Sequence, residues 1–136
     1  MIKKRIWASI LSGDTILTVL FILTISSAVL CGAKYYLDMS KTQRANADIS
    51  AISTAIAQYE LEIGEYPDSL QDLTSEKGQY GPWLKEVPTD VFSKNQHYKY
   101  LKDKKHYIVY SVGPDGTASS SLATGISGDD IGYKDN

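Results

Sequence analysis

Three aspartates near the end of the chain are the residues best suited to hold a metal ion. Asp115 stands at one end of a segment rich in glycine and serine, and Asp129 and Asp130 stand at the other. Calcium suits this pattern, because it accepts roughly six to eight oxygen ligands from carboxylates and backbone carbonyls in an irregular loop. The spacing differs from an EF-hand, whose ligands alternate within about twelve residues and end in a glutamate. A solvated acidic tail is the alternative, and composition alone favours it.

Catalytic chemistry has little support in the sequence. The two histidines, His97 and His106, lie in segments expected to be strands, where they are more often ordinary surface or edge residues. The chain has no His-Glu-x-x-His zinc pattern, no phosphate-binding loop and no nucleophile motif. We therefore expect a protein that is not an enzyme. An exported hydrolase stays in consideration only if a pocket brings a histidine beside carboxylates.

The aspartates must be positioned by a short sheet. Residues 97–101 and 106–112 are rich in tyrosine and β-branched side chains, which predicts two antiparallel strands, and the charged residues 103–105 predict an exposed hairpin turn between them. Residues 113–136 have no apolar periodicity. Their composition predicts a flexible end, unless some contact ties the two ends of the segment together.

A long amphipathic helix precedes these strands. The chain has neither proline nor glycine from residue 34 to residue 62, and one apolar stripe recurs at spacings of three and four: Ile49, Ile52, Ile56, Tyr59 and Ile63. Gly64 is a candidate C-cap, with Pro67 shortly after it. A short second helix is expected over residues 70–76, capped by Asp68 or Ser69. One long helix packed on a small antiparallel sheet is an α+β plan.

The segment from Thr15 to Ala33 carries no charge, and it follows a head that contains Lys3, Lys4 and Arg5. At about 1.5 Å per residue a helix over this segment covers roughly the 30 Å of a bilayer's hydrocarbon core. A retained span is favoured, because no turn signal other than Gly32 separates it from the amphipathic helix. A cleaved secretory signal ending near Ala33 is the alternative. A lipoprotein signal is disfavoured, because Leu30 precedes Cys31 where a small residue is needed.

Composition bounds the function further. The chain of 136 residues has room for one soluble core beyond the apolar segment, and its net charge of -2 argues against nucleic-acid binding. The single cysteine, Cys31, excludes an intramolecular disulfide and a cysteine metal cluster. Because a basic head stays in the cytoplasm, the acidic C-terminal end is expected on the other side of the membrane.

Four blocks of the sequence resemble the major pseudopilin of type II secretion, the G component, within the type IV pilin-like family. The blocks occur in the family's order: residues 48–59 followed by Gly-Glu-Tyr-Pro at 64–67, residues 81–90, Tyr-Ser-Val-Gly-Pro-Asp-Gly at 110–116, and Gly-Asp-Asp-Ile at 128–131. The resemblance implies a type IV pilin-like fold, with a long N-terminal helix, a small antiparallel sheet and an irregular C-terminal loop. Its expected parts are a basic leader over residues 1–13, the transmembrane half of the helix over 14–33 and a periplasmic globular domain over 34–136.

The resemblance also implies a function and a set of partners. A prepilin peptidase would cut after Gly13, so that Asp14 begins the mature chain, held in the inner membrane by a single span with its N-terminus cytoplasmic. Subunits would assemble as a homo-oligomeric filament in the periplasm, with minor pseudopilins and inner-membrane secretion components, and help to drive protein export. A calcium ion would be held by Asp115, Asp129 and Asp130, with backbone carbonyls such as those around Val112.

The sequence departs from the family at the head. Members have Phe-Thr-Leu-Ile-Glu after the glycine, whereas Asp14 and Thr18 stand here in place of the phenylalanine and the glutamate. That glutamate is understood to neutralise the N-terminal amine of a neighbouring subunit, which a threonine cannot do. A membrane-anchored pilin-like or minor pilin protein that does not polymerise is therefore the alternative function. A second departure is Val91-Phe92, where the family usually has Pro-Trp.

Overall fold

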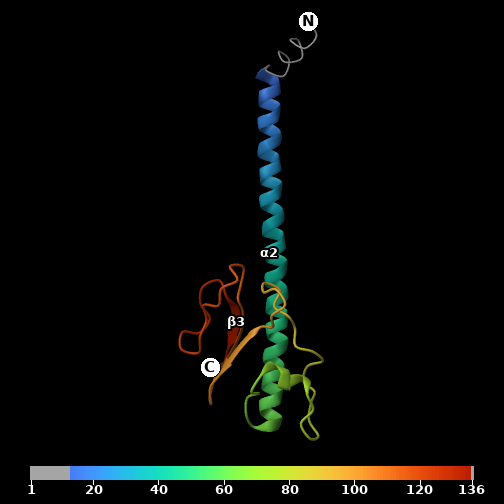
Figure 1. Ribbon diagram of the computed structural model, residues 1–136, viewed down its shortest axis with the longest axis vertical. Helices are drawn as coiled ribbons and strands as arrows, with labels where there is room; N and C mark the ends of the chain where they lie inside the picture. The colour runs from blue at the N-terminus through green and yellow to red at the C-terminus, as the bar shows by residue number, and fades with distance from the viewer. Residues whose placement is uncertain (1–12, 136) are drawn as a thin grey trace. The chain divides into compact units, whose positions relative to one another are not determined.

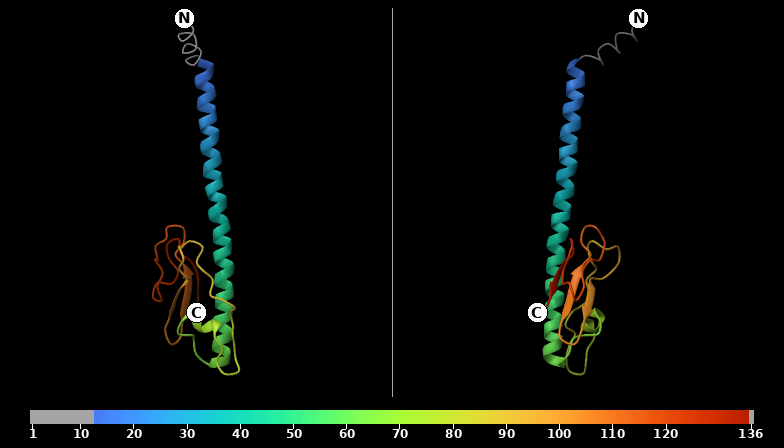
Figure 2. Two further views of the ribbon diagram at one scale, coloured as in Figure 1. Left: turned by 45° about the vertical axis from the view of Figure 1, so that its right-hand side comes forward. Right: turned by 90° about the vertical axis from the view of Figure 1, so that its left-hand side faces the viewer.

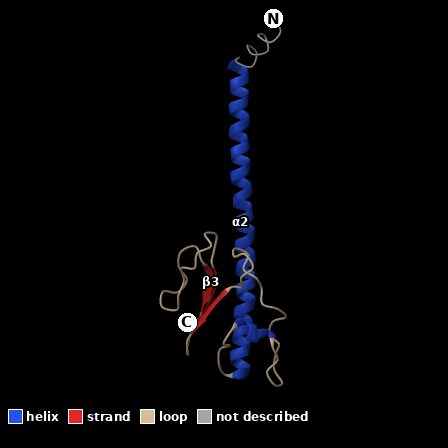
Figure 3. Cartoon of the chain, in the orientation of Figure 1, coloured by secondary structure: helices blue, strands red, loops and turns tan. Residues whose placement is uncertain are grey.

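The computed structural model describes residues 13–135. In this part of the chain the order is a long helix, α2 (Gly13–Ile63), a short 3-10 helix, η1 (Leu70–Thr74), and the strands β1 (Lys99–Lys102), β2 (Tyr107–Ser111) and β3 (Ile131–Lys134). Figure 1 shows these elements in chain order, and Figure 3 distinguishes helix, strand and loop. Of the expected leader over residues 1–13, residues 1–12 lie outside the described residues.

The chain divides into two compact units, Met1–Asp38 and Met39–Asn136. In the first unit, the described residues form the N-terminal part of α2, and their large apolar side chains are exposed, from 48% for Ile16 to 73% for Tyr36. This helix includes a window with a mean hydropathy of 2.4, so it is long and apolar enough to cross a membrane. Hydroxyl groups in this segment can bond to the helix itself: Thr24 donates to the Phe21 carbonyl at 2.8 Å.

The second unit contains the hydrophobic core. The apolar stripe of α2 is buried as its spacing predicts, with Ile52 and Ile56 at 0% exposure and Tyr59 at 1%. The helix ends at Ile63 because Gly64 adopts a φ of 91°, and the Gly64 N–H returns to the Glu60 carbonyl at 2.7 Å. The C-cap prediction is therefore confirmed.

The sheet has the order β1-β2-β3, and both pairs of strands are antiparallel. All residues of β2 are buried, because β2 lies between the other two strands and the sheet packs on the apolar stripe of α2. Figure 2 shows the strands running alongside the C-terminal half of the helix. The expected α+β, pilin-like arrangement is confirmed.

Two details differ from the sequence-based expectation. The segment after Pro67 forms the 3-10 helix η1 over Leu70–Thr74 rather than a helix reaching residue 76, and its N-cap is Ser69, which shares a capping box with Asp72. The segment after Gly113 contains β3, which pairs with β2 from Ile131 opposite Ser111 to Lys134 opposite Ile108. The prediction of a flexible end without structure is therefore wrong.

Candidate metal site in the C-terminal loop

The C-terminal loop is the segment from Gly113 to Asp130 that joins β2 to β3. A buried carboxylate, that of Asp90, holds the backbone where this loop begins. Asp90 is 3% exposed. It accepts hydrogen bonds from the Ser111 hydroxyl at 2.6 Å, the Val112 N–H at 3.1 Å and the Phe92 N–H at 2.9 Å. The end of β2 is thereby tied to the loop that precedes β1.

The two ends of the C-terminal loop meet at Gly113. This residue has a φ of 68°, and a Cβ built there would lie 2.2 Å from the backbone oxygen of Asp129. Only glycine lets the backbones come this close without strain. The carboxylate of Asp129 then reaches across and accepts the Asp115 N–H at 2.9 Å. Asp115 in turn accepts the Thr117 N–H at 2.7 Å, which closes a tight turn.

Asp130 organises the middle of the C-terminal loop. It is 8% exposed, and its Oδ2 accepts the N–H groups of Ser119 at 2.8 Å and Ser120 at 2.7 Å, together with the Ser120 hydroxyl at 2.6 Å. The other carboxylate oxygen, Oδ1, is buried and has no hydrogen-bond partner. A buried carboxylate oxygen without a partner is costly, so this atom is where the loop would gain most from a cation.

The structure brings the predicted metal ligands to one loop but does not gather their carboxylates. Asp115 and Asp129 meet through a backbone N–H, and Asp130 turns toward the serines. Among residues 13–135 there is no group of three or more His, Cys, Asp or Glu side chains placed to hold a metal ion. The N–H of Val112 is bonded to Asp90. The donor chemistry fits calcium, since carboxylates and turned backbone carbonyls are its usual ligands, but backbone oxygens would have to complete the shell.

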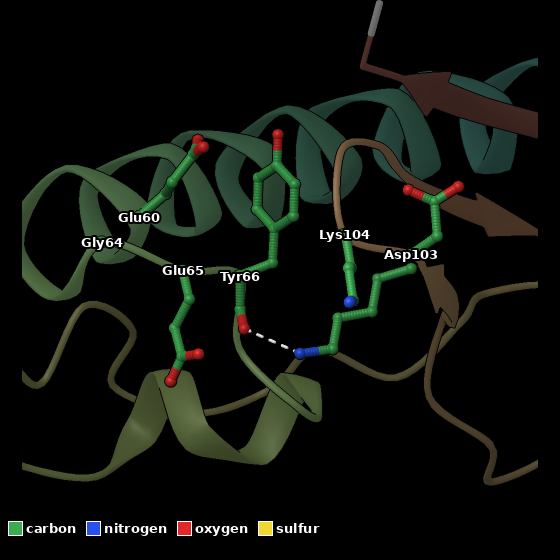
Figure 4. Close-up of a pocket in the computed structure, with 7 residues that line it drawn as sticks. Glu60, Gly64, Glu65, Tyr66, Asp103 and Lys104 are labelled. Carbon is green, nitrogen blue, oxygen red and sulfur yellow. Dashed lines mark hydrogen bonds between the residues drawn. The ribbon is translucent and has the colours of Figure 1, made fainter.

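A pocket of about 550 Å³ lies instead where the end of α2 meets the β1–β2 turn. Figure 4 shows Glu60, Tyr66 and Lys104 around it, with Lys102 bonded to the Tyr66 carbonyl at 2.8 Å. Lys102 also pairs with Asp68 at 2.7 Å, which lowers the pKa of that carboxyl. The lysine thus joins the hairpin to the segment after α2, a structural role.

The histidines do not assemble a catalytic group with a carboxylate. His97 and Asp68 line one pocket, but the His97 Nδ1 faces the Pro88 carbonyl at 3.1 Å, and Asp68 pairs with Lys102. His106 sits in the hairpin turn, where its N–H donates to Asp103 at 2.8 Å. The ring Nδ1 of His106 is buried and has no hydrogen-bond partner among the described residues.

The processing positions lie at the start of α2. Gly13 is the first residue of the helix, and Asp14 is exposed in its first turn, a favourable place for a carboxylate near the helix N-terminus. The hydroxyl of Thr18, which stands where the related family has a glutamate, donates to the Asp14 carbonyl one turn earlier. Thr18 therefore completes its hydrogen bonding within its own helix.

Comparison with known proteins decides the family. A family model described as type II secretion system protein G matches residues 34–127. The chain belongs to this family. The core protein G of type II secretion in Xanthomonas campestris pv. campestris is 28% identical over 102 residues, which cover 71% of this chain and 68% of that protein. The protein G family consists of structural components of a secretion system rather than enzymes.

Family membership places the described features in context. The protein G match covers the second half of α2, strands β1 and β2 and most of the C-terminal loop, and it ends before β3. The charge-free part of α2, from residue 15 to residue 33, precedes the matched region and is consistent with a single anchor in the inner membrane. Sequence reasoning missed the role of Asp90, although Asp90 ends one of the blocks that carried the resemblance.

Proposed function

We propose that this protein is a pseudopilin subunit that assembles into a periplasmic helical filament of a type II secretion system and helps to drive proteins across the outer membrane. One observation carries the proposal: a folded domain of the protein G family continues from a helix whose first part exposes a charge-free apolar surface. Such a surface has to be covered by lipid or by other apolar helices. A membrane and a filament core supply these two coverings in turn, and neither role requires a catalytic group.

The topology and the partners follow from the same features. The basic head stays in the cytoplasm, α2 crosses the inner membrane once, and the second unit lies in the periplasm. The partners are further copies of the chain, minor pseudopilins, the inner-membrane secretion components and a prepilin peptidase that cuts between Gly13 and Asp14. Nucleic acid is not among them, because the chain carries a net charge of -2.

Complementation tests this function. We expect the chain to restore secretion in cells that have a type II system but lack their own protein G, and mass spectrometry to find a mature chain beginning at Asp14 only when the peptidase is present. The variant Gly13→Leu is the control, because it changes the cut site and leaves the globular domain intact. Failure to restore secretion, with a correctly cut and folded subunit, would contradict the proposal.

One feature favours a second candidate, an anchored pilin-like protein that does not polymerise. No carboxylate occurs between Thr15 and Ala33, and Thr18 is bonded to its own helix. A subunit without a carboxylate there has nothing to neutralise a neighbour's terminal amine in the apolar filament core. Cross-linking of membrane-bound protein separates the two functions: a ladder of oligomers supports the filament, and monomers alone support the anchored protein.

We further propose that the C-terminal loop binds calcium. Asp115, Asp129 and Asp130 would supply carboxylate oxygens, and the backbone carbonyl of Val112 would add to the shell. The buried, unpaired Oδ1 of Asp130 supports this proposal, since a cation would satisfy it.

Thermal unfolding tests the ion. Calcium that binds only the folded protein stabilises it by about 2.7 kcal/mol at a hundredfold excess over the dissociation constant. We expect chelator to lower the melting temperature of the parent but not of Asp130→Asn or Asp115→Ala. Asp68→Ala is the matched control, because this carboxylate pairs with Lys102 outside the loop. Identical melting curves of the parent with and without chelator would remove calcium from the proposal.

A further inference from the structure

An aromatic pair stands where the charge-free part of α2 ends. Tyr35 and Tyr36 follow Lys34 directly and are 68% and 73% exposed, with their rings in a T-shaped arrangement at 6.2 Å between centroids. The next residue, Leu37, is 64% exposed. Large apolar side chains exposed one after another are uncommon on the surface of a soluble helix, so this segment calls for a covering.

The arrangement around the helix axis indicates what kind of covering fits. Successive residues of an α-helix are turned by about 100°, so Tyr35, Tyr36 and Leu37 together spread over roughly 200° of the circumference. A partner helix covers one stripe, with residues repeating at spacings of three and four. Three consecutive exposed apolar residues do not form such a stripe, so one partner helix cannot cover all three. A medium that surrounds the helix can.

The chemistry of the two tyrosines indicates that this medium is the interfacial layer of a lipid bilayer. A tyrosine has an apolar ring and a polar hydroxyl, which suits the boundary between headgroups and acyl chains. Lys34, immediately before the pair, can keep its ammonium in the same layer while its stem lies along apolar surface. In the preceding segment, by contrast, the hydroxyls of Thr24 and Ser27 bond to carbonyls of the same helix.

The spacing along the helix agrees with this placement. From Asp14 to Tyr35, α2 rises roughly 30 Å at about 1.5 Å per residue, which equals the thickness of the hydrocarbon core. We propose that Tyr35 and Tyr36 form an interfacial collar that docks at the headgroup level of a phospholipid bilayer, with Asp14 at the opposite boundary. This inference rests on the membrane anchoring proposed above and adds to it the depth at which the subunit is held.

Depth-dependent fluorescence quenching tests the collar. The full chain with Trp7→Phe and Trp83→Phe is reconstituted in phosphatidylethanolamine and phosphatidylglycerol vesicles, and one tryptophan is placed at Tyr36→Trp or at Ile25→Trp. Lipids carry a nitroxide either on the headgroup or at the middle of the acyl chain. We expect Tyr36→Trp to be quenched at least twofold more by the headgroup label, and Ile25→Trp at least twofold more by the chain label. Tyr80→Trp, in the globular unit, is the control and should be quenched by neither.

The outcomes separate the collar from the anchor. If Ile25→Trp is not quenched by the chain label, the proposed span fails, and the collar fails with it. If Ile25→Trp behaves as expected but Tyr36→Trp escapes the headgroup label, only the collar is overturned. Quenching of Tyr36→Trp that appears only when the protein is diluted in lipid would show that a second copy covers the pair, which also overturns the collar. Tyr35→Ser with Tyr36→Ser should shift the Ile25→Trp reporter away from the bilayer centre, whereas Tyr35→Phe with Tyr36→Phe should shift it less.

Discussion

At the scale of single residues, Asp90 shows how this fold keeps a carboxylate buried. Its carboxylate accepts hydrogen bonds from neutral donors, the Phe92 and Val112 N–H groups and the Ser111 hydroxyl. Hydrogen bonds to a charged acceptor are stronger than those between neutral groups, which offsets the loss of hydration. Asp90 thus links two segments far apart in sequence without any lysine or arginine.

We expect Asp90→Ala to lower the free energy of unfolding by roughly 3 kcal/mol, because it leaves a buried hydroxyl and a buried N–H without their acceptor. Ser111→Ala is the matched control. It removes one donor and leaves the carboxylate its two backbone partners, so we expect a loss of only about 1 kcal/mol. Urea unfolding followed by circular dichroism measures both, and equal midpoints for the two variants would contradict this account of the site.

The aspartates of the C-terminal loop show what residue types can and cannot predict. The sequence indicated that Asp115, Asp129 and Asp130 belong to one loop, because glycines and serines separate them. It could not indicate that one carboxylate oxygen of Asp130 accepts hydrogen bonds from Ser119 and Ser120 while the other is buried without a partner, since this depends on the directions of backbone N–H groups. Asp90 carried no signal of its role, because its partners come from the far end of β2.

At the scale of elements, the long helix was predictable and the third strand was not. The stripe of α2 repeats over several turns, and Gly64 marks its end, so periodicity and capping agree. Strand β3 is short, carries Gly132 and follows a glycine-rich loop, so no run of alternating apolar residues announces it. Gly132 is needed there because a Cβ would lie 2.6 Å from the Tyr110 Cβ. Strand β3 forms because the second edge of β2 needs a hydrogen-bonding partner, and the sequence of β3 alone does not reveal this.

Two glycines of the C-terminal loop form a matched pair for testing its closure. Gly113 and Gly116 both have positive φ, 68° and 72°, but a Cβ would collide with Asp129 only at Gly113. We expect Gly116→Ala to cost about 1 kcal/mol, the strain of the left-handed conformation. We expect Gly113→Ala to cost at least twice as much, because the backbones must also separate. Thermal unfolding measures both, and equal losses would mean that the close approach does not hold the loop.

The β1–β2 hairpin gives a pH dependence with a definite sign. The N–H groups of Lys105 and His106 hold the pKa of Asp103 below its usual value. The resulting stability is present above the unfolded pKa of about 3.9 and is lost as the pH falls through the folded pKa. We expect Asp103→Ala to melt below the parent at about pH 7 and the gap to narrow toward about pH 3. Asp103→Asn, which keeps an acceptor without a charge, should show less of this narrowing. A constant gap would contradict the prediction.

At the scale of the whole molecule, tyrosines join the helix to the sheet region: the hydroxyls of Tyr98 and Tyr107 donate to Asp48 and to the Ser53 carbonyl of α2. Among the described residues, burial raises the pKa of five hydroxyls, those of Tyr66, Tyr98, Tyr100, Tyr107 and Tyr110. Tyr107 lies at the centre of this group, with its ring 5.1 Å from that of Tyr66 and 5.9 Å from that of Tyr133. The core is therefore sensitive to alkali, because several of its phenols are buried.

We expect alkaline unfolding to follow from this distribution. A raised pKa contributes stability in full below the unfolded value of about 10, and this stability is lost as the pH rises toward the folded value. The folded value is about 12 for Tyr107. Tyrosinate absorbance and circular dichroism should therefore change together in one cooperative step. Tyr107→Phe should move the midpoint to higher pH, and ionisation of the tyrosines without unfolding would contradict the prediction.

Strand β3 pairs with β2 but lies far from it in the sequence, and this separation affects how a subunit folds during export. Strand β1 ends at Lys102, close to Tyr107, whereas β3 begins only at Ile131. On the topology proposed above, the domain crosses the membrane from its N-terminal end, so β2 arrives well before β3. During that interval one edge of a strand destined for the core has unpaired backbone groups, the state in which strands pair with the wrong chain. The subunit can then finish folding only after its last strand has crossed the membrane. Slow translocation therefore lengthens the period in which two subunits can aggregate.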